Sequence, residues 1–188
     1  MTVLIVIPAR YASTRYPAKP LAMLKGASGQ SCSLIERSWR AACEVGGVVS
    51  GANKSQKKKL FNFGKNLGTA FQLTDDALDY EGSSSKMGKS NGDDFYDGKI
   101  TLPVILALKN ADKQEKDFWE KTFNKKVRNK TDLRIAKKII KDKNTISQTL
   151  KLANEYGEKA KYIMKDFESN PIRNALIDLV DFSLIRNH

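Results

Sequence analysis

The sequence predicts an all-α fold of packed helices, preceded by one short strand and a loop. From Ser55 onward, apolar residues recur at spacings of three and four, which is the repeat of an amphipathic helix. No second strand is convincing after Ile7, and a lone strand has no partner for its backbone groups. With 188 residues the chain is long enough to bury a sizeable core.

Residues 1–33 are the least helical part of the chain. Val3–Ile7 is an apolar, β-branched run that ends at Pro8, which predicts a buried strand. Residues 9–20 are rich in Arg, Ser, Tyr and Pro and predict a loop, and residues 25–33 predict a second loop or linker.

The rest of the chain predicts helices separated by short connections. Pro103 falls in the first turn of one of them, where proline is tolerated, and Asn144 and Asn170 are suitable helix starts. Residues 81–99 are rich in glycine and predict a loop. The expected helices cover residues 34–49, 55–80, 100–109, 113–127, 131–142, 145–167 and 171–186.

Composition indicates a globular protein without a membrane span. Hydrophobic residues make up 40% and charged residues 29%, and no apolar run approaches the ~20 residues of a transmembrane helix. Met1–Pro8 is too short for a signal peptide and lacks its basic leader. Cys32 and Cys43 form neither a disulfide framework nor a zinc site. A cytoplasmic location is therefore expected.

The net charge of +12 invites a nucleic-acid interpretation, but its distribution favours a simpler one. Residues 109–143 hold 13 basic and 6 acidic residues, mostly lysines on helical sequence with few aromatic residues. A solvated lysine-rich face explains this excess. A helix-borne nucleic-acid patch is the alternative, and nucleic acid is not an expected partner.

A cluster of aspartates stands near the end of the long amphipathic segment. Asp75, Asp76 and Asp79 place carboxylates at positions i, i+1 and i+4, so two of them lie one helical turn apart on one face. Leu73 and Leu78 are expected to hold this helix in a core. Three neighbouring carboxylates repel one another unless a cation lies between them, and Mg²⁺ prefers oxygen ligands shared with phosphates. The alternative is a solvated acidic helix end.

The loop that follows supplies positive charge. Its lysines are Lys86, Lys89 and Lys99, and glycines at positions 88, 92 and 98 let the backbone approach an anion closely. An acidic helix followed by a glycine–lysine loop predicts a metal-bridged polyphosphate site.

These residues resemble a known family. Residues 68–80 (Gly-Thr-Ala-Phe-Gln-Leu-Thr-Asp-Asp-Ala-Leu-Asp-Tyr), Gly88-Lys89, Gly92-Asp93-Asp94 and residues 97–103 (Asp-Gly-Lys-Ile-Thr-Leu-Pro) closely resemble the second aspartate-rich region of long-chain trans-polyprenyl diphosphate synthases. The resemblance covers residues 41–188 and is nearest to octaprenyl-type enzymes. It implies part of an isoprenoid-synthase helical bundle.

The resemblance also implies a chemistry. Family members join an allylic diphosphate to isopentenyl diphosphate after Mg²⁺-assisted departure of diphosphate. By resemblance Asp75, Asp76 and Asp79 bind the metal, and Lys89 and Lys99 contact diphosphate oxygens. Gln72 would lie beside the reacting carbons and Phe71 would line the substrate cleft; Asp75, Asp76 and Gln72 are the implied catalytic residues. The implied partner is a second copy of the chain or a full-length synthase.

The chain departs from the family pattern in two respects. The family carries two facing aspartate-rich motifs, whereas this sequence offers one. A Lys-Thr pair of the family corresponds to Leu34 and Ile35. The chain alone is therefore expected to be catalytically incomplete.

Residues 1–40 resemble a different family. Val3–Leu21 is similar to the start of the CMP-KDO synthetases (3-deoxy-manno-octulosonate cytidylyltransferases), whose first loop binds CTP phosphates. That resemblance implies phosphate contacts by Arg10, Ser13, Arg15 and Lys19, although Ala18 replaces the usual glycine. The sequence thus predicts a composite chain, 1–40 and 41–188, joined between residues 33 and 42. A cytidylyltransferase fragment and a non-catalytic partner of a full-length synthase are the rival functions.

Overall fold

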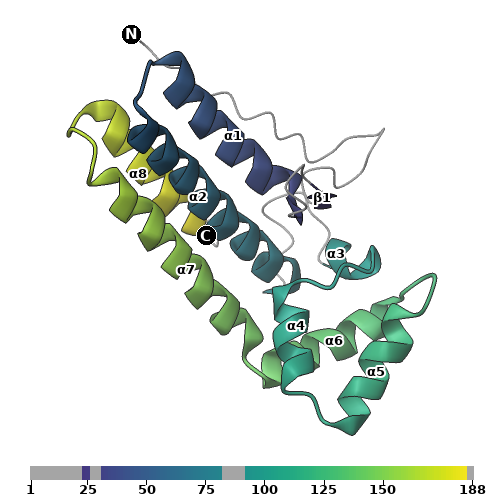
Figure 1. Ribbon diagram of the computed structural model, residues 1–188. Helices are drawn as coiled ribbons and strands as arrows, with labels where there is room; N and C mark the ends of the chain where they lie inside the picture. The colour runs from purple at the N-terminus through teal and green to yellow at the C-terminus, as the bar shows by residue number, and fades with distance from the viewer. Residues whose placement is uncertain (1–22, 26–30, 82–91, 186–188) are drawn as a thin grey trace. The chain divides into compact units, whose positions relative to one another are not determined.

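The computed structural model describes residues 23–25, 31–81 and 92–185, and over this part it confirms the all-α prediction (Figure 1). The strand predicted at Val3–Ile7 lies outside the described residues. The helices are α1 (Leu34–Val49), α2 (Lys54–Glu81), α3 (Asp93–Tyr96), α4 (Leu102–Lys109), α5 (Lys113–Phe123), α6 (Lys130–Asp142), α7 (Thr145–Met164) and α8 (Pro171–Leu184). They form two compact units, and the long helices α2 and α7 each contribute to both.

The first unit contains α1, α8, α2 as far as Gln72 and α7 from Ala153 onward. Its helices enclose one apolar core with a free, buried cysteine in it. That core consists of Trp39, Cys43, Phe63, Leu67, Ala160, Met164 and Val180. Gly64 lets α1 approach α2, since a Cβ there would lie only 2.6 Å from the Trp39 carbonyl oxygen.

Two short strands precede α1, where the sequence predicted only a loop. β1 (Met23–Lys25) pairs antiparallel with β2 (Ser31–Ser33), with Leu24 opposite Cys32. The loop prediction for residues 25–33 was therefore wrong at both ends. Three-residue strands are too short to show an alternating pattern, so no periodicity in the sequence predicts them.

The second unit contains α3 to α6, α2 from Leu73 onward and α7 as far as Leu152. Its core consists of Tyr80, Phe95, Val104, Ala107, Trp119, Leu133, Ala136, Ile139 and Ile140. Two capping boxes start its helices: Asp112 and Glu115 exchange hydrogen bonds at α5, and Asn129 and Asp132 do so at α6. These caps fix where the two helices begin.

Some predicted boundaries in this region change. Residues 93–96, predicted as loop, form the short helix α3, and α5 ends at Phe123 rather than near residue 127. Asn144 stands at a helix start as predicted, since α7 begins at Thr145 and the Asn144 carbonyl oxygen accepts the Gln148 N–H; its left-handed φ of 53° separates α7 from α6. Asn170 does cap α8, because its side chain accepts a hydrogen bond from the Arg173 backbone N–H.

Candidate aspartate–lysine site

The aspartate cluster lies on the last two turns of α2, as the spacing predicted. Asp75 and Asp76 are buried, each with only 7% of its surface exposed, and Asp79 is half-buried. Buried carboxylates are costly unless they are hydrogen-bonded or coordinate a cation. The burial therefore contradicts the alternative of a solvated acidic helix end.

The core-facing side of this helix differs from the prediction. Leu73 and Leu78 are only half-buried, whereas Ala70, Ala77 and Tyr80 are buried. Alanine allows neighbouring elements to approach closely, and Tyr80 supplies the apolar bulk. The helix that carries the carboxylates is therefore buried along a side that includes the small residues Ala70 and Ala77.

A chain of hydrogen bonds joins Asp79 to the segment that ends at Lys99. The Asp79 carbonyl oxygen accepts from the Gly92 N–H at 3.0 Å, and its Oδ2 accepts from the Asp94 N–H at 3.2 Å. Asp94 in turn accepts a hydrogen bond from Lys99 Nζ at 2.6 Å, and its carbonyl oxygen accepts the Lys99 backbone N–H at 2.9 Å. Residues 79, 94 and 99 are therefore held as one polar unit.

Charge is balanced around Lys99. Burial acts to lower the pKa of Lys99, but the carboxylates of Asp94 and Asp97 outweigh it and raise that pKa. The Asp97 oxygen lies 3.1 Å from Lys99 Nζ, and the side chain of Lys99 remains 29% exposed. Lys99 is thus a fixed cation with one accessible side.

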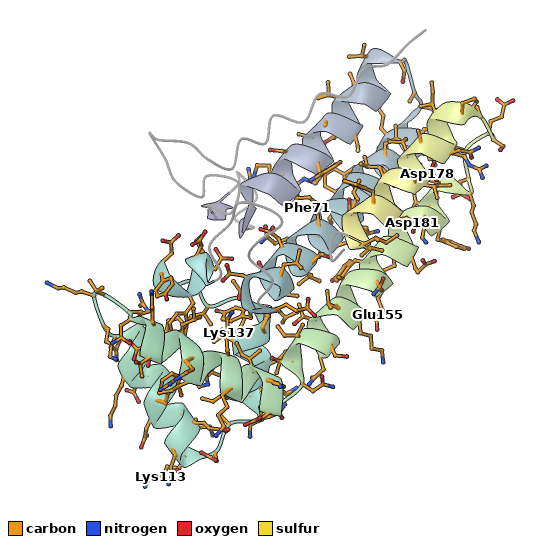
Figure 2. All side chains as sticks on the ribbon, turned by 180° about the vertical axis from the view of Figure 1, so that it is seen from behind. Phe71, Lys113, Lys137, Glu155, Asp178 and Asp181 are labelled. Carbon is orange, nitrogen blue, oxygen red and sulfur yellow. The ribbon has the colours of Figure 1, made fainter. Side chains whose placement is uncertain are left out.

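Two neighbouring groups respond to the aspartates. Burial raises the pKa of the Tyr80 hydroxyl, and the negative charge of Asp79 adds to this effect. Burial lowers the pKa of Lys137 on α6, while Asp79 opposes the change. The second unit therefore presents a second lysine within the field of Asp79 (Figure 2).

The remaining predicted residues divide into two groups. Phe71 and Gln72 precede the aspartates on α2; Phe71 packs against the first unit's core, with its ring 6.2 Å from that of Trp39 (Figure 2). Gln72 is half-buried. Outside the described residues lie Lys89 and the proposed nucleotide contacts Arg10, Ser13, Arg15 and Lys19.

The donor set fits a hard cation that keeps other ligands. Within the described ranges, no three Asp, Glu, His or Cys side chains are arranged to hold a metal ion by themselves. Mg²⁺ is usually held by one or two carboxylates together with water and phosphate oxygens. Asp75 and Asp76 are carboxylates that could supply such ligands, and Lys99 is the nearby positive charge that could contact a phosphate.

Sequence reasoning missed Lys137, Arg128 and the pairing of Asp94 with Lys99. Asp94 was assigned to a loop, yet it is buried against Lys99. Arg128 was not singled out, although its guanidinium donates to the carbonyl oxygens of Tyr96 and Phe123. Only the acidic pair Asp93–Asp94 gave any local signal; the other two depend on contacts between distant parts of the sequence.

In the part of the chain that the structure describes, every helix is too short or too polar to be a membrane span.

Comparison with known proteins finds similarity to prenyl-transferring enzymes. The profile of the family described as "Polyprenyl synthetase" matches residues 37–140. A "Prenyl transferase" from Cyanidium caldarium is 35% identical over 160 residues, which is 83% of this chain and 46% of that protein. An "Octaprenyl diphosphate synthase" from Haemophilus influenzae is 31% identical over 157 residues, covering 83% and 47% of the two chains.

A solved structure gives the same result. The polyprenyl synthase from Caulobacter crescentus, crystallised with calcium and isoprenyl diphosphate, superposes with a TM-score of 0.76 at 38% identity. The match covers 83% of this chain and 48% of that one. The chain thus spans about half the length of the proteins that it matches.

Proposed function

Because this chain belongs to the polyprenyl synthetase family, we propose that it carries the second aspartate-rich site of a trans-prenyltransferase. The reaction elongates an allylic diphosphate with isopentenyl diphosphate. One observation carries the proposal: two buried aspartates and Asp79 lie on α2, and Asp79 is hydrogen-bonded to the segment that positions Lys99. This combination suits a metal-bridged diphosphate.

The metal proposed for this site is Mg²⁺, which Asp75, Asp76 and Asp79 would hold together with water and diphosphate oxygens. When bound, it neutralises diphosphate charge and assists its departure from the allylic carbon. The structure that this chain resembles holds calcium, another oxygen-seeking divalent cation, together with isoprenyl diphosphate. The calcium ion in that relative supports the proposal of a divalent-metal site made of carboxylates in this chain.

Side chains of the protein would bind the diphosphate and position the reacting carbons. Lys99 and Lys89 would donate hydrogen bonds to diphosphate oxygens, where negative charge grows as the carbon–oxygen bond breaks. Gln72 would lie beside the reacting carbons, and Phe71 would contact the apolar substrate chain. The double bond of isopentenyl diphosphate then attacks the allylic cation, and a proton is lost.

Two features bear on the activity of these 188 residues by themselves. The chain matches only about half of each relative, and Leu34 and Ile35 stand where the family carries a Lys-Thr pair. We therefore expect the purified chain alone to make little or no polyprenyl diphosphate. A turnover near 1 s⁻¹, common among enzymes, would contradict this expectation. The partner would be a second copy or a full-length synthase, in the cytoplasm, where the free thiol of Cys43 stays reduced.

A separate proposal concerns the origin of residues 1–40. The family match begins at residue 37, which supports a junction between residues 33 and 42. The cytidylyltransferase-like origin proposed for residues 1–40 rests only on the resemblance of Val3–Leu21. Reading the genomic DNA across this junction tests it. Continuous cytidylyltransferase coding sequence upstream agrees with a composite chain, whereas an upstream polyprenyl-synthase half joined in frame contradicts it.

Ligand preference tests the function itself. We expect farnesyl diphosphate with Mg²⁺ to raise the melting temperature of the chain, because a ligand that binds only the folded state stabilises it. CTP with Mg²⁺ is the comparison ligand. A larger shift with CTP would favour the cytidylyltransferase alternative and overturn the prenyltransferase proposal.

A further inference from the structure

A seven-residue segment, Gly92–Gly98, leads directly into Lys99, and its two ends pack against Leu133 of α6 and against Arg128, which lies two residues before α6. At the first end, a Cβ on Gly92 would lie 2.6 Å from Leu133 Cδ2. At the second end, a Cβ on Gly98 would lie 2.7 Å from Arg128 Nη2 and 2.9 Å from Cζ. Both glycines have positive φ, 89° and 76°, which other residues rarely adopt. Close packing and backbone conformation therefore both require glycine here.

Arg128 ties this segment to the end of α5. Its Nη1 donates to the Tyr96 carbonyl oxygen at 3.2 Å, and its Nη2 donates to the Phe123 carbonyl oxygen at 2.9 Å. The guanidinium also lies over the Phe123 ring, with Cζ 5.3 Å from the centroid. One planar group thus bridges two backbone segments that are 27 residues apart in sequence.

The base of this bridge is rigid. Arg128 immediately precedes Asn129, the capping residue of α6, and the capping box with Asp132 fixes the backbone there. Lys125 adds an ion pair to Asp132 at 2.6 Å. The guanidinium therefore projects from a fixed backbone, and the orientation of the segment before Lys99 follows from it.

We propose that Arg128 is a positioning residue for diphosphate recognition, holding the turn at Gly98 so that Lys99 stays beside Asp94, whose backbone N–H is hydrogen-bonded to Asp79. The proposal rests on the function proposed above for Lys99. It requires the fork of a guanidinium, because two different nitrogens donate to the two carbonyl oxygens and a lysine ammonium on one flexible stem does not bridge them in the same way. The charge of Arg128 alone is not the feature that matters.

Arg128→Gln and Arg128→Lys test this idea in the full chain. Arg173→Gln is a matched control: Arg173 in the first unit also donates through Nη1 to a backbone carbonyl oxygen, that of Phe167, at 3.2 Å. Titration with inorganic diphosphate in excess Mg²⁺ gives the dissociation constant. We expect both Arg128 variants to raise it about tenfold, the size of one lost charge-assisted hydrogen bond. The Arg173 variant should keep the wild-type value.

Hydrogen exchange at the Lys99 amide gives a readout that needs no ligand. This N–H donates to the Asp94 carbonyl oxygen, so displacement of the turn should lower its protection. We expect faster exchange in both Arg128 variants and unchanged exchange in Arg173→Gln.

The outcomes separate this proposal from the function that it rests on. Wild-type affinity in Arg128→Lys would show that only charge matters, and unchanged exchange at Lys99 would show that the turn does not depend on Arg128; either result overturns the proposal. If the wild-type chain does not bind diphosphate while exchange at Lys99 rises in the Arg128 variants, the proposed function fails and the positioning role of Arg128 stands.

Discussion

The contact between α1 and α2 at Gly64 offers a sharp test of the packing in the first unit. A Cβ at this position would lie 2.6 Å from the Trp39 carbonyl oxygen, 2.9 Å from Arg40 Cα and 3.0 Å from Cys43 Sγ. Comfortable contact begins near ~3.4 Å, so α1 would have to move by roughly 0.8 Å. Two of the three obstacles are backbone atoms, which cannot rotate away.

The expected effect of Gly64→Ala is a net loss of stability. Overpacking of this kind costs about 1–3 kcal/mol, and replacing glycine by alanine inside a helix returns at most about 1 kcal/mol. The free energy of unfolding should therefore fall by about 1–2 kcal/mol. For a chain of this size that lowers the melting temperature by roughly 3–6 °C.

Gly157→Ala in α7 is the matched control. Its new Cβ would lie 2.6 Å from Leu184 Cδ1, which is the end of a flexible side chain and is free to turn aside. We expect a melting temperature equal to or slightly above that of the wild type. Thermal unfolding followed by circular dichroism compares the two variants. Equal or greater stability of Gly64→Ala than of the wild type would refute the close approach of α1 and α2.

Three further predictions concern other parts of the molecule. Asp112→Ala removes the capping box with Glu115 and should lower the free energy of unfolding by about 1 kcal/mol in urea titration; no change would mean that α5 does not depend on its cap. Burial raises the pKa of Cys43 to about 12, so its neutral thiol stabilises the folded state fully below the unfolded pKa of ~8.5, and this stability is lost as the pH rises toward 12. Cys43→Ala should therefore show a shallower alkaline loss of stability, by up to ~1.4 kcal/mol per pH unit, and identical slopes would contradict the burial of the thiol. Lys99→Met should weaken binding of inorganic diphosphate in Mg²⁺ about tenfold by calorimetry, and wild-type affinity would exclude Lys99 from the site.

The long helices were predictable because apolar residues recur along them at spacings of three and four. Apolar spacing predicted a helix from Ser55 to about Tyr80, and α2 runs from Lys54 to Glu81. The helix α3 was not predictable in this way. It has four residues, too few for any period, and its position depends on the hydrogen bond from the Asp94 N–H to Asp79, fifteen residues earlier.

The residues of the candidate site also differ in whether a local sequence pattern predicts them. The aspartates on α2 and Lys99 were identified from residue type and spacing, since like charges one turn apart on an apolar helix need a cation. Arg128 and Lys137 were not identified, because neither belongs to a local pattern. Folding alone brings Arg128 against Gly98 and brings Lys137 into the electrostatic field of Asp79. The expectation that Leu73 and Leu78 face the core failed for a related reason: side-chain size suggested it, but Ala77 and Tyr80 occupy the buried side.

The central claim is that the aspartates of α2 bind Mg²⁺ and diphosphate together. Shared ligands make the two bind cooperatively, so Mg²⁺ with inorganic diphosphate should raise the melting temperature more than the sum of their separate effects. Asp75→Asn keeps the size of the side chain but removes one negative charge, and it should abolish most of that cooperative shift. Asp117→Asn, an exposed aspartate on α5, is the control and should behave as the wild type.

Differential scanning calorimetry of these three proteins, each with Mg²⁺, diphosphate, both or neither, is the most direct measurement. The account predicts a cooperative shift in the wild type and in Asp117→Asn, and its loss in Asp75→Asn. An equal cooperative shift in all three proteins would show that the aspartates of α2 are not the metal–diphosphate site.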